Sequence, residues 1–317
     1  MLDVLPSLNE AEMSVAAGKP LDQLIGDTPL LRFRRVVEGL SPAVQVLAKA
    51  EWYNPGGSIK DRAALSIIRA AEASGQLTTR NMLIDATSGN TGIGYAMIGA
   101  AQGYRVKLVL PANVNQERIA ILRAYGAELV FSDEMEGTDG AVELVRKLVA
   151  AAPDRYFYAD QYGNPANWQA HYHATGPEIW RQTAGEVTHF VAGLGTSGTM
   201  MGVGRFLRTM NPDVRLSSLQ PDGPLHGLEG LKHMQTARMP PIFDPSLVDE
   251  NREVRTEDAY QMARCLAREE GLFVGVSAAA AMVAALEVAR ELAIGTVVTV
   301  LPDGGYKYMG ERFWTGE

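Results

Sequence analysis

The chain has 317 residues, and its 46% hydrophobic and 21% charged residues are typical of a globular protein with one large or two modest domains. The formal net charge of −8, with scattered basic residues, argues against nucleic acid as the main partner, because phosphate backbones need a concentrated basic face. The lone Cys265 excludes a disulfide framework and a zinc ribbon. The sequence shows neither a signal peptide nor an apolar run of bilayer length, so we expect a cytoplasmic protein without membrane contact.

Short apolar runs alternate with helical patterns along the chain. Most of the runs carry β-branched residues and end at Gly, Pro, Ser or Asp, which predicts strands at 44–52, 81–87, 105–111, 127–132, 188–195, 214–221 and 296–305. Helical patterns occupy 61–75, 90–104, 115–126, 141–152 and 256–270. This alternation predicts the α/β class, with two open twisted sheets of parallel type flanked by helices. We expect one unit at 52–164 and a second formed by 1–51 and 165–317.

A Gly-rich loop at 193–202 follows one of these strands and opens a helix. Its glycines match the dinucleotide pattern G-x-G-x-x-G, and Asp222 follows the next strand, as an NAD ribose ligand would. The same backbone N–H groups would also hold one phosphate monoester, with extra donors from three hydroxyls. The residues of this candidate phosphate site are Gly195, Thr196, Ser197, Gly198 and Thr199. A tight turn without a ligand is the plain alternative.

A second polar loop, at 86–94, also stands at a strand end. Helix capping explains one or two of its hydrogen-bonding side chains, but not all four. Such a loop would bind a carboxylate through its backbone N–H groups and hydroxyls at a helix N-terminus. Its candidate residues are Thr87, Ser88, Gly89, Asn90 and Thr91.

Lys60 follows the Gly-Gly-Ser segment 56–58 at the expected start of a helix. A lone lysine in that position is usually a solvated charge. Together with a phosphate cradle and a carboxylate cradle, it indicates pyridoxal phosphate, whose aldehyde a lysine must hold, and an amino acid substrate. Ser277 opens an alanine-rich helix, where a helix cap is the simpler interpretation, and Asp303 precedes a Gly-Gly turn.

The chain resembles the fold type II pyridoxal-phosphate enzymes, and among them the cysteine synthases of the B type, which are O-acetylserine sulfhydrylases. The resemblance covers almost the whole chain from Ile25 and is carried, in the family's order, by IGDTPLL, NPGGSIKDRAA, TSGNTGIGYA, DQYGNPAN, GLGTSGTMMG, GLEGLKHM and PDGGYKYMGERFW. It implies a homodimer with pyridoxal phosphate as cofactor. The implied reaction is a β-replacement, in which a sulfur donor displaces the acetate of O-acetyl-L-serine and L-cysteine forms.

The resemblance also implies a role for each motif residue. Lys60 would bind the cofactor aldehyde and then act as general base on the substrate. Asn90 would contact the ring hydroxyl, Ser277 the pyridine nitrogen, and the loop Gly195–Thr199 the phosphate. Gly230 would lie in the loop that faces the substrate amine, and the substrate carboxylate would meet Thr87, Ser88, Gly89, Thr91 and Gln161. We expect the unit 52–164 to close over bound substrate and shield the reaction from water.

Four positions depart from the family's usual pattern. Ala86 replaces a common proline, Ser197 replaces a common glycine, and alanines follow Ser277 where a second serine and a glycine are frequent. Gly304 replaces a usual serine, which could alter the hydrogen bonds at the pyridine end.

Several alternatives remain open on the sequence. The resemblance admits the cystathionine β-synthase reaction, which condenses serine with homocysteine, although we expect neither a haem-binding arm nor a regulatory module here. Phosphoserine is a less favoured substrate, because relatives that use it have an arginine in the segment that reads QPDGPLHG here, and this segment has none. An NAD-dependent dehydrogenase or a non-catalytic anion-binding protein would leave Lys60 unexplained. We predict no metal site, because His171 and His173 are spaced i, i+2 without nearby carboxylates. The sequence also leaves the sulfur donor open, as sulfide, thiosulfate or a protein thiocarboxylate.

Overall fold

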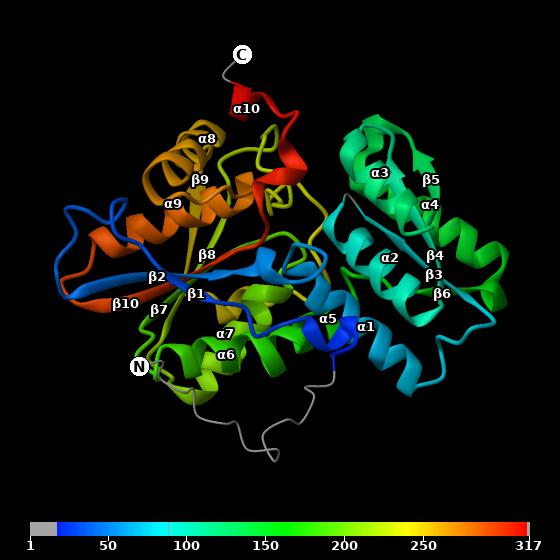
Figure 1. Ribbon diagram of the computed structural model, residues 1–317, viewed down its shortest axis with the longest axis horizontal. Helices are drawn as coiled ribbons and strands as arrows, with labels where there is room; N and C mark the ends of the chain where they lie inside the picture. Colours follow the sequence, from blue (N-terminus) through cyan, green and yellow to red (C-terminus); the bar gives the residue numbers. More distant parts are fainter. Residues whose placement is uncertain (1–17, 88, 316–317) are drawn as a thin grey trace, which may run out of the picture.

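The computed structural model describes residues 18–87 and 89–315, which form two sheets lying side by side (Figure 1). Within these residues the larger sheet has six strands in the order β1-β2-β10-β7-β8-β9. All its neighbouring strands are parallel except β1 and β2. The strands are β1 (Leu30–Arg32), β2 (Val44–Ala50), β7 (His189–Gly193), β8 (Arg215–Pro221), β9 (Glu250–Val254) and β10 (Gly295–Leu301).

The smaller sheet is parallel throughout, in the order β5-β4-β3-β6. Its strands are β3 (Met82–Ala86), β4 (Arg105–Pro111), β5 (Glu128–Ser132) and β6 (Tyr156–Tyr158). All of them lie within the range 52–164. The boundaries of that unit stay a prediction, while the predicted α/β class with two helix-flanked sheets is confirmed.

Helices cover both faces of the larger sheet, as the alternation of side chains along its strands requires. On one face lie α8 (Thr256–Cys265) and α9 (Val276–Arg290), and Val297 of β10 packs into their core. On the other face, the next residue, Val298, packs with residues of α7 (Gly198–Met210) and α6 (Gly176–Gln182). Each such fully buried aliphatic side chain contributes roughly 1.5–3 kcal/mol relative to exposure.

The smaller sheet is covered in the same way. Leu83 of β3 faces a core shared with α1 (Lys60–Ala73), α2 (Asn90–Gln102) and α3 (Gln116–Ala124). Its neighbour Ile84 faces the opposite core, which contains residues of α4 (Gly137–Ala151). The remaining helices are α5 (Pro165–Ala170), which a π-helical turn at His171–Thr175 joins to α6, and α10 (Arg312–Thr315). None of the described helices is both long and apolar enough to cross a membrane.

The structure adds three strands that the sequence analysis did not predict. β1 and β6 are only three residues long, and β9 has the polar sequence ENREV, so none gives a clear apolar pattern. β9 is the edge strand of the larger sheet next to β8, which explains its polar side chains.

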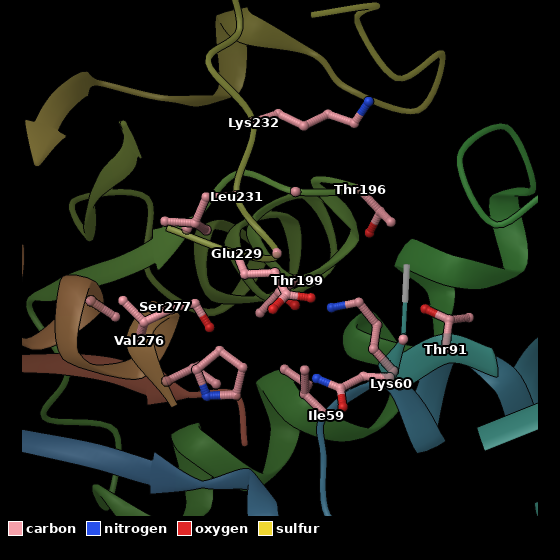
Figure 2. Close-up of a pocket in the computed structure, with 18 of the residues that line it drawn as sticks. Ile59, Lys60, Thr91, Thr196, Thr199, Glu229, Leu231, Lys232, Val276 and Ser277 are labelled. Atoms are coloured by element: carbon pink, nitrogen blue, oxygen red, sulfur yellow. The ribbon is translucent and has the colours of Figure 1, made fainter. Parts of the chain in front are cut away.

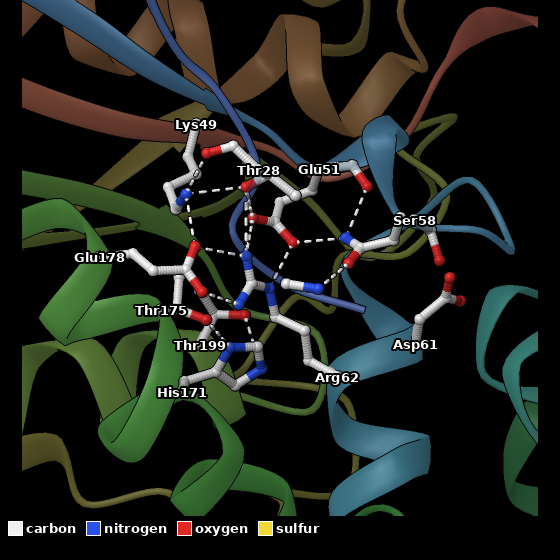
Figure 3. Close-up of polar contacts among 12 residues, drawn as sticks. Thr28, Lys49, Glu51, Ser58, Asp61, Arg62, His171, Thr175, Glu178 and Thr199 are labelled. Atoms are coloured by element: carbon white, nitrogen blue, oxygen red, sulfur yellow. Dashed lines mark hydrogen bonds and ion pairs between the residues drawn. The ribbon is translucent and has the colours of Figure 1, made fainter. Parts of the chain in front are cut away.

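A buried ionic network fixes the first turn of α1 to the larger sheet (Figure 3). The guanidinium of Arg62 donates to both carboxylate oxygens of Glu51, at 2.7 and 2.9 Å, and of Glu178 in α6, at 2.6 and 2.8 Å. Lys49 at the end of β2 lies 2.6 Å from the same Glu178 carboxylate. Because these groups are buried and mutually paired, they hold the start of α1, where Lys60 stands, against β2 and α6.

Candidate active site

A cavity of about 490 Å³ opens where strands of both sheets end (Figure 2). The carboxyl ends of β3, β7 and β10 all lead into it, which is where open α/β folds bind ligands. Every predicted site residue that the structure describes lines this cavity, and Ser88 lies outside the described residues. The lining residues in question are Lys60, Thr87, Gly89, Asn90, Thr91, Gln161, Gly195, Thr196, Ser197, Gly198, Thr199, Gly230 and Ser277.

Lys60 is placed by pairing between the segment before α1 and the segment after β10. Ser58 forms an antiparallel bridge with Asp303, and the Ile59 N–H donates to the Pro302 carbonyl at 2.8 Å. The Lys60 side chain reaches from α1 toward the side of the cavity where Thr199 and Ser277 lie (Figure 2).

The ammonium group of Lys60 has no hydrogen-bond or ion-pair partner in the part of the chain that the structure describes. Burial lowers the pKa of Lys60, although the carboxylates of Asp303 and Glu51 act in the opposite direction. A half-buried lysine without a partner and with a lowered pKa is suited to act as a nucleophile and as a base. The electrostatics of the site therefore support chemistry at this amine.

The loop before α7 forms an anion cradle. A Cβ atom on Gly195 would collide with the Gly230 carbonyl, and one on Gly198 would collide with the side chain of Asn167, so both positions require glycine. Within residues 18–87 and 89–315, nothing accepts a hydrogen bond from the N–H groups of Thr196, Ser197 and Thr199. Unused N–H groups at a helix N-terminus fit a phosphate.

The Ser197 and Thr199 hydroxyl groups of this loop differ in their hydrogen-bond partners. Ser197 donates its hydroxyl to the Thr196 carbonyl at 2.6 Å, so its side chain is already engaged. The Thr199 hydroxyl lies 3.5 Å from Nε2 of His171, whose Nδ1 is 3.0 Å from the Thr175 hydroxyl. Burial and the nearby Arg62 charge lower the pKa of His171 to about 3, so this histidine is neutral and supports the loop through hydrogen bonds alone.

Hydrogen bonds of the Thr87 hydroxyl and of the Gln161 side chain hold the 87–91 loop before α2. The Thr87 hydroxyl oxygen accepts the N–H groups of Gly89, the N-cap of α2, and of Gly92 in its first turn, at 3.2 and 3.1 Å. Thr91 donates its hydroxyl to Oε1 of Gln161 at 2.6 Å, and Nε2 of Gln161 donates to the Ala86 carbonyl at 2.6 Å. Gln161 is therefore fixed against this loop although it is far away in the sequence.

Asn90 and Ser277 both line the cavity, Asn90 at the start of α2 and Ser277 in the first turn of α9. Nδ2 of Asn90 donates to Asp303 at 2.7 Å, and its Oδ1 accepts from Lys307 at 2.9 Å. α9 begins at Val276 with Gly275 as its N-cap, so Ser277 is not the helix cap that its local sequence favours. No described side chain or backbone group binds the Ser277 hydroxyl, which points into the cavity (Figure 2).

Several charged residues that were not predicted from the sequence also line the cavity. The guanidinium of Arg118 in α3 makes two bonds to the carboxylate of Glu229 and lies 5.0 Å from the Tyr308 ring centre. Lys232 also lines the cavity, with its ammonium 4.8 Å from the centre of the Tyr162 ring. No sequence motif marks these positions, since a lysine or arginine in a helix or loop usually faces solvent.

The dinucleotide alternative finds no support in the geometry. Asp222, the predicted ribose ligand, is exposed and is not among the cavity-lining residues. The residues that do converge are Lys60, the loop before α7 and the loop that is predicted to bind a carboxylate. Fold and site together define the class of α/β proteins that bind a small anionic ligand, next to a reactive lysine, between the strand ends of two parallel sheets.

Comparisons with known proteins identify the family within that class. A family model described as pyridoxal-phosphate dependent enzyme matches residues 21–303, so the chain belongs to this family. The chain is 51% identical over 292 residues to a cysteine synthase of Aquifex aeolicus, covering 90% of this chain and 89% of that protein. It is 45% identical over 289 residues to cysteine synthase B of Salmonella typhimurium, covering 91% and 94%.

A solved structure agrees with these relatives. The crystal structure of cysteine synthase (OASS) from Entamoeba histolytica matches with a TM-score of 0.90 at 33% identity, covering 98% of this chain and 94% of that one. The fold is therefore that of the fold type II pyridoxal-phosphate enzymes, and the predicted resemblance and cofactor class are confirmed.

Proposed function

We propose that this chain forms L-cysteine from O-acetyl-L-serine and a sulfur donor by a pyridoxal-phosphate-dependent β-replacement. The observation that carries the proposal is the half-buried Lys60, whose ammonium has no partner among the described residues and which lies in one cavity with an anion cradle and a loop suited to a carboxylate. The names of the similar proteins described above support the same activity.

The residues present fit the cofactor. The free N–H groups at the start of α7 would hold its phosphate, the Lys60 amine its aldehyde, and Ser277 its ring nitrogen. Bound pyridoxal phosphate supplies an aldehyde that bonds covalently with amines and a ring that withdraws electrons from the substrate α-carbon. Ser277 offers a neutral hydroxyl instead of a carboxylate, so it would not keep the ring nitrogen protonated.

The substrate would be oriented by its carboxylate. Thr91 and Gln161 are held together at 2.6 Å beside the backbone N–H groups of the 87–91 loop, at the positive end of α2. This placement would direct the α-carbon toward the Lys60 amine. Nζ of Lys60 would then take the α-proton, which a lowered pKa favours because more of the amine is neutral at a given pH. Acetate would leave the β-carbon, and the sulfur donor would add there.

Replacing Lys60 with alanine tests the central residue. We expect the purified wild-type protein to be yellow and borohydride reduction to fix the cofactor to Lys60. Lys60→Ala should lose about 10²-fold or more in the rate of acetate release, because the general base is removed. A colourless wild-type protein that stays inactive after addition of pyridoxal phosphate would disprove the proposal. Thr78→Ala, in an exposed loop outside the cavity, serves as a control and should behave as wild type.

The second substrate is tested by competition between nucleophiles. The protein is first supplied with O-acetylserine, and sulfide, thiosulfate, a protein thiocarboxylate and homocysteine are then compared by the rate at which each gives product. We expect an inorganic or thiocarboxylate sulfur to outpace homocysteine. A homocysteine rate above all the others would instead establish cystathionine formation.

Three further properties belong to the same proposal. The family resemblance supports a homodimer, and we expect a cytoplasmic location. We also propose that the unit 52–164, which carries the 87–91 loop, moves toward the rest of the molecule when substrate binds. Sedimentation equilibrium measures the dimer, and small-angle scattering with and without an unreactive amino acid measures the movement.

A further inference from the structure

Lys307 is a half-buried cation beside the site to which the proposed function assigns no role. It lies in a short helical turn, Gly305–Tyr308, after β10. Its ammonium donates to the carbonyls of Gly56 and Gly57, at 2.9 and 3.3 Å, and to Oδ1 of Asn90 at 2.9 Å. An ammonium has three donors and no acceptor, so these three bonds use its whole capacity.

This arrangement determines which way the Asn90 amide points. Because Lys307 can only donate, the atom of Asn90 that faces it must be the oxygen, and the NH₂ group must face away. On that other side, Nδ2 meets Oδ2 of the buried Asp303 at 2.7 Å, and Tyr308 donates its hydroxyl to the same oxygen at 2.7 Å. A flipped amide would place its NH₂ group against the Lys307 ammonium and its oxygen against the Asp303 carboxylate. Both contacts would be unfavourable.

The orientation leaves one N–H of Asn90 available to a ligand. The amide has two N–H donors, and only the bond to Asp303 is formed among the residues that the structure describes. Asn90 lines the same cavity as Lys60, at the first turn of α2. A flipped amide would present an acceptor there and would repel an oxyanion.

We propose that Lys307 is a positioning residue for the cofactor, because its ammonium holds the Asn90 amide with an N–H directed at the cofactor's ring oxygen. The inference rests on the proposed function, since it requires pyridoxal phosphate in this cavity. The two bonds to the Gly56 and Gly57 carbonyls anchor the ammonium in place, beside the turn that leads into Lys60.

The test measures cofactor binding instead of activity. Lys307→Met removes the ammonium but keeps the length of the side chain, and Lys147→Met on the exposed face of α4 is the matched control. Apoprotein is titrated with pyridoxal phosphate, and the dissociation constant and the absorbance maximum are recorded. We expect Lys307→Met to bind about tenfold more weakly with a shifted absorbance maximum, the loss typical of one hydrogen bond to a charged group. Lys147→Met should match the wild type.

Two further variants separate positioning from a general loss of structure. Lys307→Arg keeps a donor at this place and should lie closer to the wild type than Lys307→Met. In an Asn90→Ala background, Lys307→Met should have a much smaller effect on the dissociation constant, because the group it orients is gone. An unchanged dissociation constant in Lys307→Met, or an equal effect with and without Asn90, would overturn the inference alone. A wild-type apoprotein that does not bind pyridoxal phosphate would overturn the proposed function as well.

Discussion

Ser197 has a left-handed backbone conformation at the N-cap of α7, with φ of +65°. This conformation costs a residue with a Cβ atom about 1 kcal/mol, whereas glycine adopts it freely. The cost is consistent with the glycine that the resemblance implies as the usual residue at this position. The Ser197 hydroxyl bonds the Thr196 carbonyl and makes no cap bond to α7, so little is gained in return.

Ser197→Gly is therefore expected to stabilise the protein. The free energy of unfolding should rise by about 1 kcal/mol, as measured by chemical denaturation of the apoprotein. The matched control is Ser74→Gly at the C-cap of α1, where φ is −87° and a serine is unstrained. If both substitutions lower the stability equally, strain at Ser197 is not the explanation.

At the scale of single residues, the sequence predicts a place in the site for residues that lie in a turn directly after a strand. The glycines and hydroxyls of the 87–91 and 195–199 loops follow strands directly, so strand-to-helix geometry places them. Arg118 and Glu229 reach the cavity, and Lys307 reaches its lining residue Asn90, only because distant segments pack together. Their side-chain types are ordinary surface residues, and no local pattern separates a buried partner from a solvated charge.

The network around Glu178 shows how one carboxylate can join several elements. It accepts bonds from Arg62 in α1 and the Asp27 N–H, and it pairs with Lys49 in β2. Glu178→Gln removes the negative charge but leaves both cations buried. We expect a loss of about 3 kcal/mol in the free energy of unfolding at neutral pH. Glu257→Gln on the exposed surface of α8 is the control and should change it little. Equal stability of the two variants would contradict this account.

The same carboxylate makes the fold sensitive to acid. Burial raises the pKa of Glu178, but its bonds to Arg62 and its pairing with Lys49 outweigh burial and lower this pKa to about 2. A lowered pKa gives stability that is complete above the unfolded value of about 4.5 and is lost as the pH falls toward 2. The wild type should therefore lose its advantage over Glu178→Gln across this interval. Denaturation curves of both proteins at successive pH values measure the difference, and a constant gap would refute the expectation.

Across the whole molecule, the pair Arg118–Glu229 bridges the cavity between the two sheets. Arg118 belongs to α3 beside the smaller sheet, and Glu229 to the loop that follows β8 of the larger one. Arg118 is buried, while the Glu229 side chain is 36% exposed. The Arg118–Glu229 ion pair would therefore hold the two sheets together across the cavity, although it belongs to the hydrophobic core of neither sheet.

Glu229→Gln is expected to loosen this bridge while both cores stay folded. Amide hydrogen exchange in α3 should become faster than in the wild type, because α3 loses its charged contact across the cavity. Exchange in α4, which covers the opposite face of the smaller sheet, should stay the same. Equal acceleration in α3 and α4 would show that the substitution destabilises the whole unit instead.

The architecture itself follows from the sequence more fully than the details of its sheets. Alternating strand and helix patterns predict two parallel sheets with helices on both faces, because such strands must be buried on both sides. The order of the strands does not follow, since it depends on packing between distant segments. The N-terminal segment illustrates this limit: Leu21 and Ile25 pack against the core of the smaller sheet, although they precede β1 of the larger one.

The pairing of β2 with β10 has a consequence for the order of folding. Val44 stands beside Gly295 in the larger sheet, and every strand of the smaller sheet comes between them in the chain. The smaller sheet uses one continuous stretch and can form from nearby contacts, whereas the larger one must close a very long loop. During synthesis, the edge of β2 that pairs with β10 therefore stays without its partner until β10 has been synthesised. The cavity can form only after β10 has paired with β2.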